Sequence, residues 1–307
     1  MVDCFYRASD EFLKDAGLLK GATNFVSRKE LAELEKLAGR AILRLPGDNA
    51  RNVCEGVARL GGRATYAGCI GRDPEGRFFK RALAALHIRS LLVEKAGRTG
   101  KILVFSTPDR ERTFAVDLGN SVNYEESPEE LPEARYLYLT SITLLTPGKL
   151  GTTAWKMLKR KKTAVALSLE SPPAIARNRK RILEALRFTD VLFANEEELK
   201  ELGIPASKIS RKVSVLFLKR GKRGSTIYAG GRRIQIPSYP TRVVDTTGAG
   251  DYYAAGAVFE LAKGSDIRKA GETGARLAAE IIARLGASFY SERSQGKTIQ
   301  RSLLRTK

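Results

Sequence analysis

The sequence has one histidine and three cysteines, and these shortages exclude several kinds of site. His87, the one histidine, cannot by itself supply a histidine metal cluster or a Ser-His-Asp triad. Cys4, Cys54 and Cys69 have no Cys-x-x-Cys spacing and cannot all pair with one another. Cysteines of this kind are typical of free thiols in a reducing compartment, so we expect a cytoplasmic protein.

Long apolar runs and two nucleotide-binding patterns are also missing. No apolar run approaches the ~18 residues that a membrane helix needs, and the N-terminal "MVDCFYRASDEFLKD" has acidic residues early and no basic region before an apolar block. The sequence contains no Gly-x-x-x-x-Gly-Lys-[Ser/Thr], and "GAGDYYA" does not fit Gly-x-Gly-x-x-Gly. We therefore expect no membrane partner, no P-loop and no dinucleotide fingerprint.

Acidic residues are few relative to basic ones: 34 Asp and Glu stand against 54 Lys and Arg, a formal charge of +20. Such an excess indicates either an anionic partner or a protein with an unusually charged surface, as in a hot environment. The basic residues are spread along the chain, and no nucleic-acid-binding fingerprint accompanies them. The second explanation is favoured, and we do not expect nucleic acid as a partner.

The pattern of apolar runs predicts an α/β protein. The runs "TAVALSL", "DVLFAN" and "VSVLFLK", which begin at Thr163, Asp190 and Val213, are continuous and alternate with helical segments. This is typical of a parallel sheet covered on both faces. Residues 88–116 instead contain three strand-like runs without helices between them, which predicts a small antiparallel sheet acting as a lid. With 307 residues and no repeat or linker, we expect one domain.

The stretch with the clearest chemistry is "VVDTTGAGDYYAAG", residues 243–256. Two strand residues lead into a Gly-Ala-Gly turn at the start of a helix, where the first amides have no partner inside the helix and attract anions. Asp251 lies in that first turn, beside the anion site. The local pattern fits a general base for phosphoryl transfer, but it equally fits an acidic residue placed to stabilise the helix N-terminus.

Several motifs, in order, resemble those of the ribokinase-like (PfkB) carbohydrate and nucleoside kinases. "DTTGAGDYYAAG" resembles the family's second signature, and "ARLGGRATYAGCIGRDPEGRFF" from Ala58 is similar to its first. "GDNARN" from Gly47 resembles the sugar-site segment Gly-Gly-x-Ala-x-Asn, "NEEE" from Asn195 matches Asn-x-x-Glu, and "LKRGKRGS" from Leu218 resembles the strand and turn near the nucleotide. "SDEFLKDAGLLKG" and the ending "YAAG" resemble the adenosine-kinase-like branch. The resemblance covers nearly the whole chain.

This resemblance implies a fold and a reaction. The fold would be a single domain over residues 1–307, with a three-layer α/β/α core, a mainly parallel sheet and a small β-sheet lid formed by roughly 4–26 and 88–117. The reaction would transfer the γ-phosphate of ATP, with Mg²⁺, to a primary hydroxyl of a sugar or nucleoside. Exposed lid edges could pair two copies in a homodimer.

The resemblance also implies a role for each matching residue. Asp251 would be the catalytic base, ionised at neutral pH with its ordinary pKa of ~3.9. The amides after Gly248, those of Ala249, Gly250 and Asp251, would form the hole for the transferring phosphate.

On the nucleotide side, Asn195 and Glu198 would organise Mg²⁺ through water, although their spacing also fits a helix capping box. Asp245 would make hydrogen bonds or belong to the Mg²⁺ network. The helix over residues 271–283 would flank the adenine. The other expected nucleotide-site residues are Lys219, Gly221, Gly224, Thr246 and Ala279.

On the acceptor side, the resemblance assigns Asp3, Gly47, Asp48 and Asn52. Asp3 aligns with the family's sugar-binding acid, so the chain begins within the family's first strand; either that strand is lost or translation starts upstream. Asp48 stands where the family has a second glycine, and Arg51 replaces a small residue. We expect one of these two side chains to face the acceptor pocket. These departures leave a second hypothesis, a catalytically weakened binding or regulatory protein with a basic surface.

Overall fold

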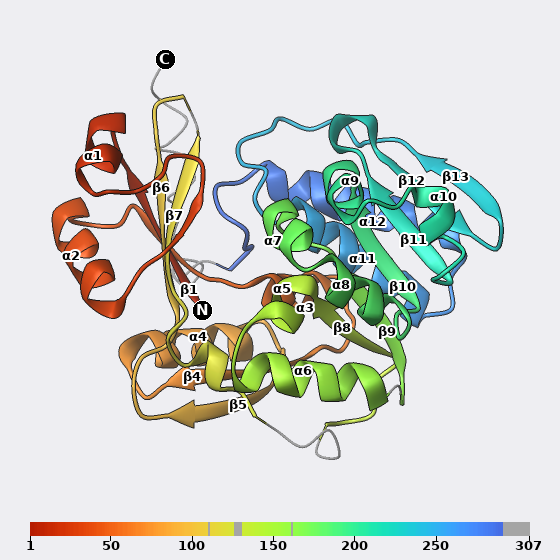
Figure 1. Ribbon diagram of the computed structural model, residues 1–307, viewed down its shortest axis with the longest axis horizontal. Coiled ribbons are helices and arrows are strands. Elements are labelled where there is room, and N and C mark those ends of the chain that lie inside the picture. Colours follow the sequence, from red (N-terminus) through yellow and green to blue (C-terminus); the bar gives the residue numbers. More distant parts are fainter. Residues whose placement is uncertain (110, 126–130, 161, 291–307) are drawn as a thin grey trace.

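The computed structural model describes residues 1–109, 111–125, 131–160 and 162–290, and its centre is a six-stranded sheet (Figure 1). The strand order is β13-β12-β11-β10-β9-β8. Neighbours from β8 to β11 pair in parallel, whereas β12 and β13 are antiparallel. The bounds are Tyr136–Thr140 (β8), Ala164–Ser168 (β9), Val191–Asn195 (β10), Val215–Lys219 (β11), Ser225–Ala229 (β12) and Arg232–Ile236 (β13).

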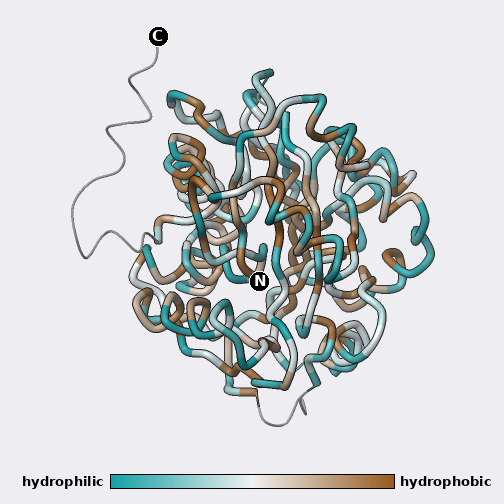
Figure 2. Tube along the Cα trace, turned by 90° about the vertical axis from the view of Figure 1, so that its left-hand side faces the viewer, coloured by the Kyte–Doolittle hydropathy of each residue, from teal (hydrophilic) through white to brown (hydrophobic). Residues whose placement is uncertain are grey.

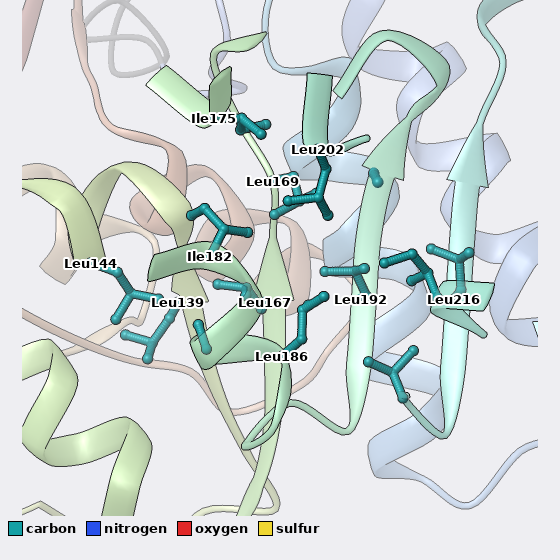
Figure 3. Packing of buried hydrophobic residues seen from close by; sticks show 14 of the residues in the cluster. Leu139, Leu144, Leu167, Leu169, Ile175, Ile182, Leu186, Leu192, Leu202 and Leu216 are labelled. Carbon is teal, nitrogen blue, oxygen red and sulfur yellow. The ribbon is translucent and has the colours of Figure 1, made fainter. Parts of the chain in front are cut away.

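Helices cover both faces of this sheet, because its middle strands are apolar on both sides. The helices form two groups, one on each face of the sheet. Phe193 and Phe217 stack under the first group, with their ring centroids 5.0 Å apart, and Leu192 and Leu216 face the second group (Figure 3). The first group is α3 (Asn49–Arg59), α11 (Ala249–Ala262) and α12 (Ile267–Ile282). The second is α5 (Ser141–Leu145), α6 (Lys149–Arg160), α7 (Pro172–Arg177), α8 (Arg179–Leu186), α9 (Glu196–Leu202) and α10 (Ala206–Ile209). The predicted three-layer α/β/α core with a mainly parallel sheet is confirmed.

A second sheet of five strands, which we call the lid sheet, has the order β2-β7-β6-β1-β3. One of its faces packs on two helices at its outer side, and in Figure 1 these lie left of the strands. The strands are β1 (Val2–Arg7), β2 (Thr23–Phe25), β3 (Leu43–Pro46), β6 (Lys101–Ser106) and β7 (Arg112–Asp117), and the helices are α1 (Asp10–Asp15) and α2 (Arg28–Ala38).

The lid sheet differs in part from the expected ranges of 4–26 and 88–117. β5 (Arg89–Lys95) does not join it but pairs in parallel with β4 (Thr65–Gly71), after the crossover helix α4 (Pro74–Ala85). The expected all-antiparallel arrangement of residues 88–116 is therefore wrong for its first strand. β3 joins the lid sheet instead, through antiparallel pairing with β1. The edges of the lid sheet are β2 and β3, and a homodimer through them stays a prediction.

Hydropathy follows this layering. In Figure 2 apolar segments run through the middle of the molecule, and hydrophilic ones lie mainly outside. No helix in the described part of the chain is long and apolar enough to cross a membrane. The three cysteines are free thiols.

Helix α11, which carries Asp251, is held against α12 by glycines. A Cβ placed on Gly256 would lie 2.7 Å from the Cα of Gly274, and one on Gly274 would lie 2.6 Å from the carbonyl oxygen of Tyr253. Backbone atoms cannot yield as side chains can, so both positions require glycine for this close approach.

We expect Gly256→Ala to destabilise the protein by about 1–3 kcal/mol, because the added methyl group would push two helix backbones apart. Gly271→Ala on α12 is the matched control, since its Cβ would meet side-chain atoms of Ile227 and Ile236. The free energy of unfolding, measured in denaturant, should fall more for Gly256→Ala than for Gly271→Ala. Equal losses would contradict this explanation.

Candidate active site

The turn before α11 has the geometry of an anion site. Gly248 is the N-cap, with φ of 78°, and a Cβ there would lie 2.7 Å from the Cβ of Ala287. The amide of Ala249 donates to the carbonyl oxygen of Thr246 at 3.2 Å, which closes the turn. The next amides, of Gly250 and Asp251, belong to the first helical turn, where N–H groups have no carbonyl partner inside the helix. An anion is therefore stabilised at this end of α11.

Lys219 adds a full positive charge to this turn. It ends β11, and a Cβ on Gly250 would lie only 3.0 Å from its Nζ. The ammonium group therefore lies beside the first residues of α11. The motif order predicted Lys219 near the nucleotide, and the structure brings it to the same turn as Asp251.

The Asp251 carboxyl is buried, and its Oδ2 accepts a hydrogen bond of 2.8 Å from Nδ2 of Asn52. Burial disfavours the ionised form and raises the pKa of Asp251 to about 7, against the opposing effects of the Asn52 hydrogen bond and the Lys219 charge. The expectation of an ordinary aspartate pKa is therefore wrong. The group is a base whose proton affinity suits neutral pH, instead of one that is fully ionised there.

Glu170 is a second buried carboxyl near Asp251 that the motifs did not identify. It follows the carboxyl end of β9, and its Oε1 has no hydrogen-bond partner among the described residues. Burial and the neighbouring Asp251 charge raise its pKa. One feature of the sequence could have indicated Glu170: it follows the carboxyl end of an apolar strand, and α/β sheets bind ligands at the carboxyl ends of their strands.

On the acceptor side, Asp3 and Gly47 lie together. A Cβ on Gly47 would fall 2.0 Å from Oδ1 of Asp3, so a larger residue at position 47 would have to displace this carboxyl group. Asp3 lies on β1, its Oδ1 is buried without a hydrogen-bond partner among the described residues, and burial raises its pKa to about 6. Their roles in binding an acceptor stay predictions.

The backbone conformation of Asp48 is one that glycine adopts easily, and this explains why the family pattern has glycine at this position. Its φ is 94°, a region that L-residues rarely adopt. The side chain caps α3 by accepting from the amide of Arg51 at 2.9 Å, and it also accepts from the Tyr66 hydroxyl. Arg51 is fully buried and contacts Asn52, the residue that binds Asp251. Neither side chain is exposed. The hypothesis that Asp48 or Arg51 faces the acceptor pocket is compatible with this burial and stays a prediction.

Asp245 links three parts of the molecule. Its Oδ1 accepts from the amide of Thr247 at 2.8 Å and pairs with Arg112 of the lid sheet, and its Oδ2 accepts from the amide of Gly286 at 2.6 Å. Burial alone would raise its pKa, but these three donors hold the pKa below its ordinary value. Arg112 also donates to the Thr247 hydroxyl. The sequence motifs missed Arg112, because it lies on a strand 133 residues away from Asp245.

Asn195 and Glu198 form the capping box that their spacing predicted. The Asn195 side chain accepts from the Glu198 amide, and the Glu198 side chain accepts from the Asn195 amide, both at 2.7 Å. Burial raises the pKa of Glu198, against the charge of Lys219. Their expected role toward Mg²⁺ stays a prediction.

The remaining nucleotide-site residues lie on two elements. Gly221 and Gly224 bound the short 3₁₀ turn after β11, and a Cβ on Gly224 would fall 2.1 Å from the Ile236 carbonyl oxygen. Ala279, on α12, lines an open pocket of about 590 Å³ with Tyr239, Thr241 and Arg276. Among the described residues, no hydrogen bond or ion pair joins Ala279 to the turn that carries Asp251.

The donor set fits a nucleotide phosphate better than a tightly caged metal. The α11 turn and the Lys219 ammonium group supply amides and charge for an anion. No group of three or more His, Cys, Asp or Glu side chains in the described ranges is arranged to hold a metal ion. Mg²⁺ keeps several water ligands and needs only one or two carboxylates, so Glu198 or Glu170 with water fits its chemistry.

Comparisons with known proteins identify the family of the chain. Residues 21–293 match the pfkB family of carbohydrate kinases. A fructokinase from Klebsiella pneumoniae is 30% identical over 240 residues, covering 72% of this chain and 78% of the relative. A nucleoside kinase from Methanocaldococcus jannaschii is 26% identical over 249 residues, covering 78% of this chain and 80% of the relative.

Solved structures are similar over almost the full length. An adenosine kinase from Sinorhizobium meliloti superposes with a TM-score of 0.82 and 27% identity, covering 94% of this chain and 92% of that one. A probable sugar kinase from Rhizobium etli gives a TM-score of 0.84 at 26% identity, covering 96% and 94%. The fold is thus ribokinase-like, and the chain belongs to the pfkB family of carbohydrate kinases.

Proposed function

We propose that the protein transfers the γ-phosphate of ATP to a primary hydroxyl group of a sugar or nucleoside, with Asp251 as the general base. The observation that carries this proposal is the position of a buried, proton-accepting carboxyl in the first turn of α11, beside the Lys219 ammonium group. A base next to an anion site is the arrangement that phosphoryl transfer to a hydroxyl requires.

In this mechanism Asp251 removes the hydroxyl proton as the oxygen–phosphorus bond forms and the bond to the ADP oxygen breaks. ATP supplies the phosphoryl group, and Mg²⁺, held through water by Glu198 or Glu170, would neutralise charge on its oxygens. The amides of Gly250 and Asp251 and the Lys219 ammonium group face the charge on the transferring phosphate. The amide donors are fixed by the helix before reaction, so they need no reorganisation when the charge develops.

Unsatisfied buried oxygens favour an acceptor with several hydroxyl groups. Asp3 Oδ1 and Glu170 Oε1 are buried without hydrogen-bond partners among the described residues. A buried acceptor atom without a donor costs free energy. Hydroxyl groups of a sugar ring or a ribose would supply these donors.

The lid sheet contributes a cation to the phosphate side. Arg112 of β7 reaches Asp245 and Thr247, the residues that lead into the α11 turn, and its buried Nε has no partner among the described residues. We propose that Arg112 keeps the lid sheet over this turn and supplements its positive charge.

A substrate screen tests the proposal directly. The purified protein is incubated with ATP, Mg²⁺ and a panel of nucleosides, ribose, fructose and keto-deoxy sugars, and ADP release is measured. We expect acceptor-dependent ADP formation with at least one compound. No turnover on any of them, together with salt-dependent binding to nucleic acid, would instead support the binding or regulatory alternative.

Asp251→Asn should lower kcat by about 10²–10⁴-fold, because the amide cannot accept the hydroxyl proton. ATP affinity should stay within a few-fold, since the amide donors and Lys219 remain. Steady-state kinetics and calorimetric titration of ATP measure the two effects. Near-normal turnover in this variant would refute the role of Asp251.

The pH dependence follows from the raised pKa of Asp251, about 7. Only the ionised carboxylate accepts the proton, so kcat/KM should fall about tenfold per unit as pH drops below that value, and level off above it. A pH profile between 5 and 9 in a constant-ionic-strength buffer would test this. A profile that is flat down to pH 5 would mean that the base has an ordinary aspartate pKa.

Arg112→Ala should lower kcat/KM by about tenfold or more, because it removes charge near the phosphate and leaves the buried Asp245 carboxylate without its cation. Lys20→Ala is the matched control: Lys20 pairs with Asp10 of α1 and with Asp109 of the loop between β6 and β7, and not with Asp245 or Thr247. Kinetic measurements on both variants should show the loss in Arg112→Ala alone. Equal losses would indicate a general effect on the lid sheet.

A further inference from the structure

Helix α3 carries a fully buried cation, Arg51, one residue before Asn52. Its guanidinium group donates to Oε2 of Glu55 at 2.5 Å, to the Ser288 hydroxyl at 3.2 Å and to the Ala287 carbonyl oxygen at 3.0 Å. It also donates to Oδ1 of Asn52. A buried guanidinium group is tolerated only when such partners surround it, so its position is tightly determined.

Glu55 is the anionic partner of Arg51, and three further donors hold its carboxylate in place. Its carboxylate accepts from the Tyr252 hydroxyl at 2.5 Å, from the Ser288 hydroxyl at 2.8 Å and from the Phe289 amide at 3.0 Å. These donors come from α11 and from the segment after α12. The Arg51–Glu55 pair is therefore anchored to two elements besides α3.

This pair determines which way the Asn52 amide group points. A guanidinium group has only donors, so the atom of Asn52 that meets Arg51 must be the oxygen. The amide nitrogen is then the atom that faces Asp251, at 2.8 Å from Oδ2. Without Arg51 the amide could turn over and bring its oxygen against the Asp251 carboxylate, where two acceptors repel.

We propose that Arg51, held by Glu55, is a positioning residue for the catalytic base: it fixes the Asn52 amide so that its nitrogen donates to Asp251. This inference rests on the proposed function in one respect, that Asp251 is the base. Arg51 itself touches neither the base nor, in this proposal, the acceptor.

The sign of the effect follows from the groups around Asp251. Burial raises the pKa of Asp251, whereas the hydrogen bond from Asn52 and the charges of Lys219 and Arg51 lower it. Loss of Arg51 removes one of these charges and the constraint on Asn52, so the base becomes harder to ionise. The groups that face Asp251 from the surrounding elements are Asp48, Arg51 and Asn52 of α3 and its cap, Tyr138 of β8, Glu170 after β9, Lys219 of β11 and Tyr252 of α11.

The test replaces the buried pair without leaving a lone charge. Arg51→Met with Glu55→Gln keeps the volume and removes both charges, so folding survives more readily than in a single variant. We expect the acid limb of the kcat/KM profile to move up by roughly one pH unit, the size of one lost hydrogen bond to a charged group. At pH 6 this is about a tenfold loss, with little loss at pH 9. Arg81→Met, exposed on α4, is the matched control and should leave the profile unchanged.

A uniform loss at every pH would overturn the proposal, because a merely structural role lowers activity without moving the midpoint. A spectroscopic titration gives a second readout that needs no turnover. The protein is labelled with ¹³Cγ-aspartate, the Asp251 signal is assigned through Asp251→Asn, and its midpoint is compared with that of the double variant. A higher midpoint in the double variant supports the positioning role even if no acceptor is found, whereas an active enzyme with an unchanged midpoint refutes it and leaves the proposed function intact.

Discussion

Burial of the Asp251 carboxyl is the constraint on which the rest of the site depends. A carboxyl removed from water is costly to ionise, and this one has a hydrogen-bonding amide but no directly paired cation among the described residues. The structure offsets this cost with charges placed nearby, Lys219 at the helix turn and Arg51 behind Asn52. The result is a base whose proton affinity is matched to neutral pH. The glycines that let α11 approach α12 and Ala287 hold the helix, and so the carboxyl, at this depth.

Local sequence patterns predicted the parts of the site that are local in the chain. The Gly-Ala-Gly turn, the Asn195–Glu198 capping box and the parallel core strands each depend on residues a few positions apart, and the structure has all three. The roles of Asp251 and Asn52 came from the resemblance to the family, because 199 residues separate the two side chains that meet. Asp48, a departure from the family pattern, lies at a positive φ, which explains why glycine was expected there.

The parts that the sequence did not predict depend on distant contacts or on burial. Nothing near Arg112 in the chain indicates that it will reach Asp245, and nothing near Glu55 indicates that Ser288 and Phe289 will bind it. The strand character of residues 89–95 predicts a strand but not its partner, which the crossover through α4 sets. The sequence alone predicts an ordinary pKa for Asp251, because desolvation becomes visible only when the surrounding side chains are known.

The threefold connection of Asp245 would couple the binding of the two substrates of the proposed reaction. One carboxylate joins the lid sheet through Arg112, the entry to the α11 turn through Thr247, and the segment after α12 through Gly286. Movement of the lid sheet away from the core would break the first contact and leave a buried charge without its cation. Lid position and the shape of the α11 turn are thus thermodynamically linked. In the proposed reaction, the factor by which an acceptor under the lid sheet would tighten ATP binding is, by reciprocity, the factor by which ATP would tighten acceptor binding.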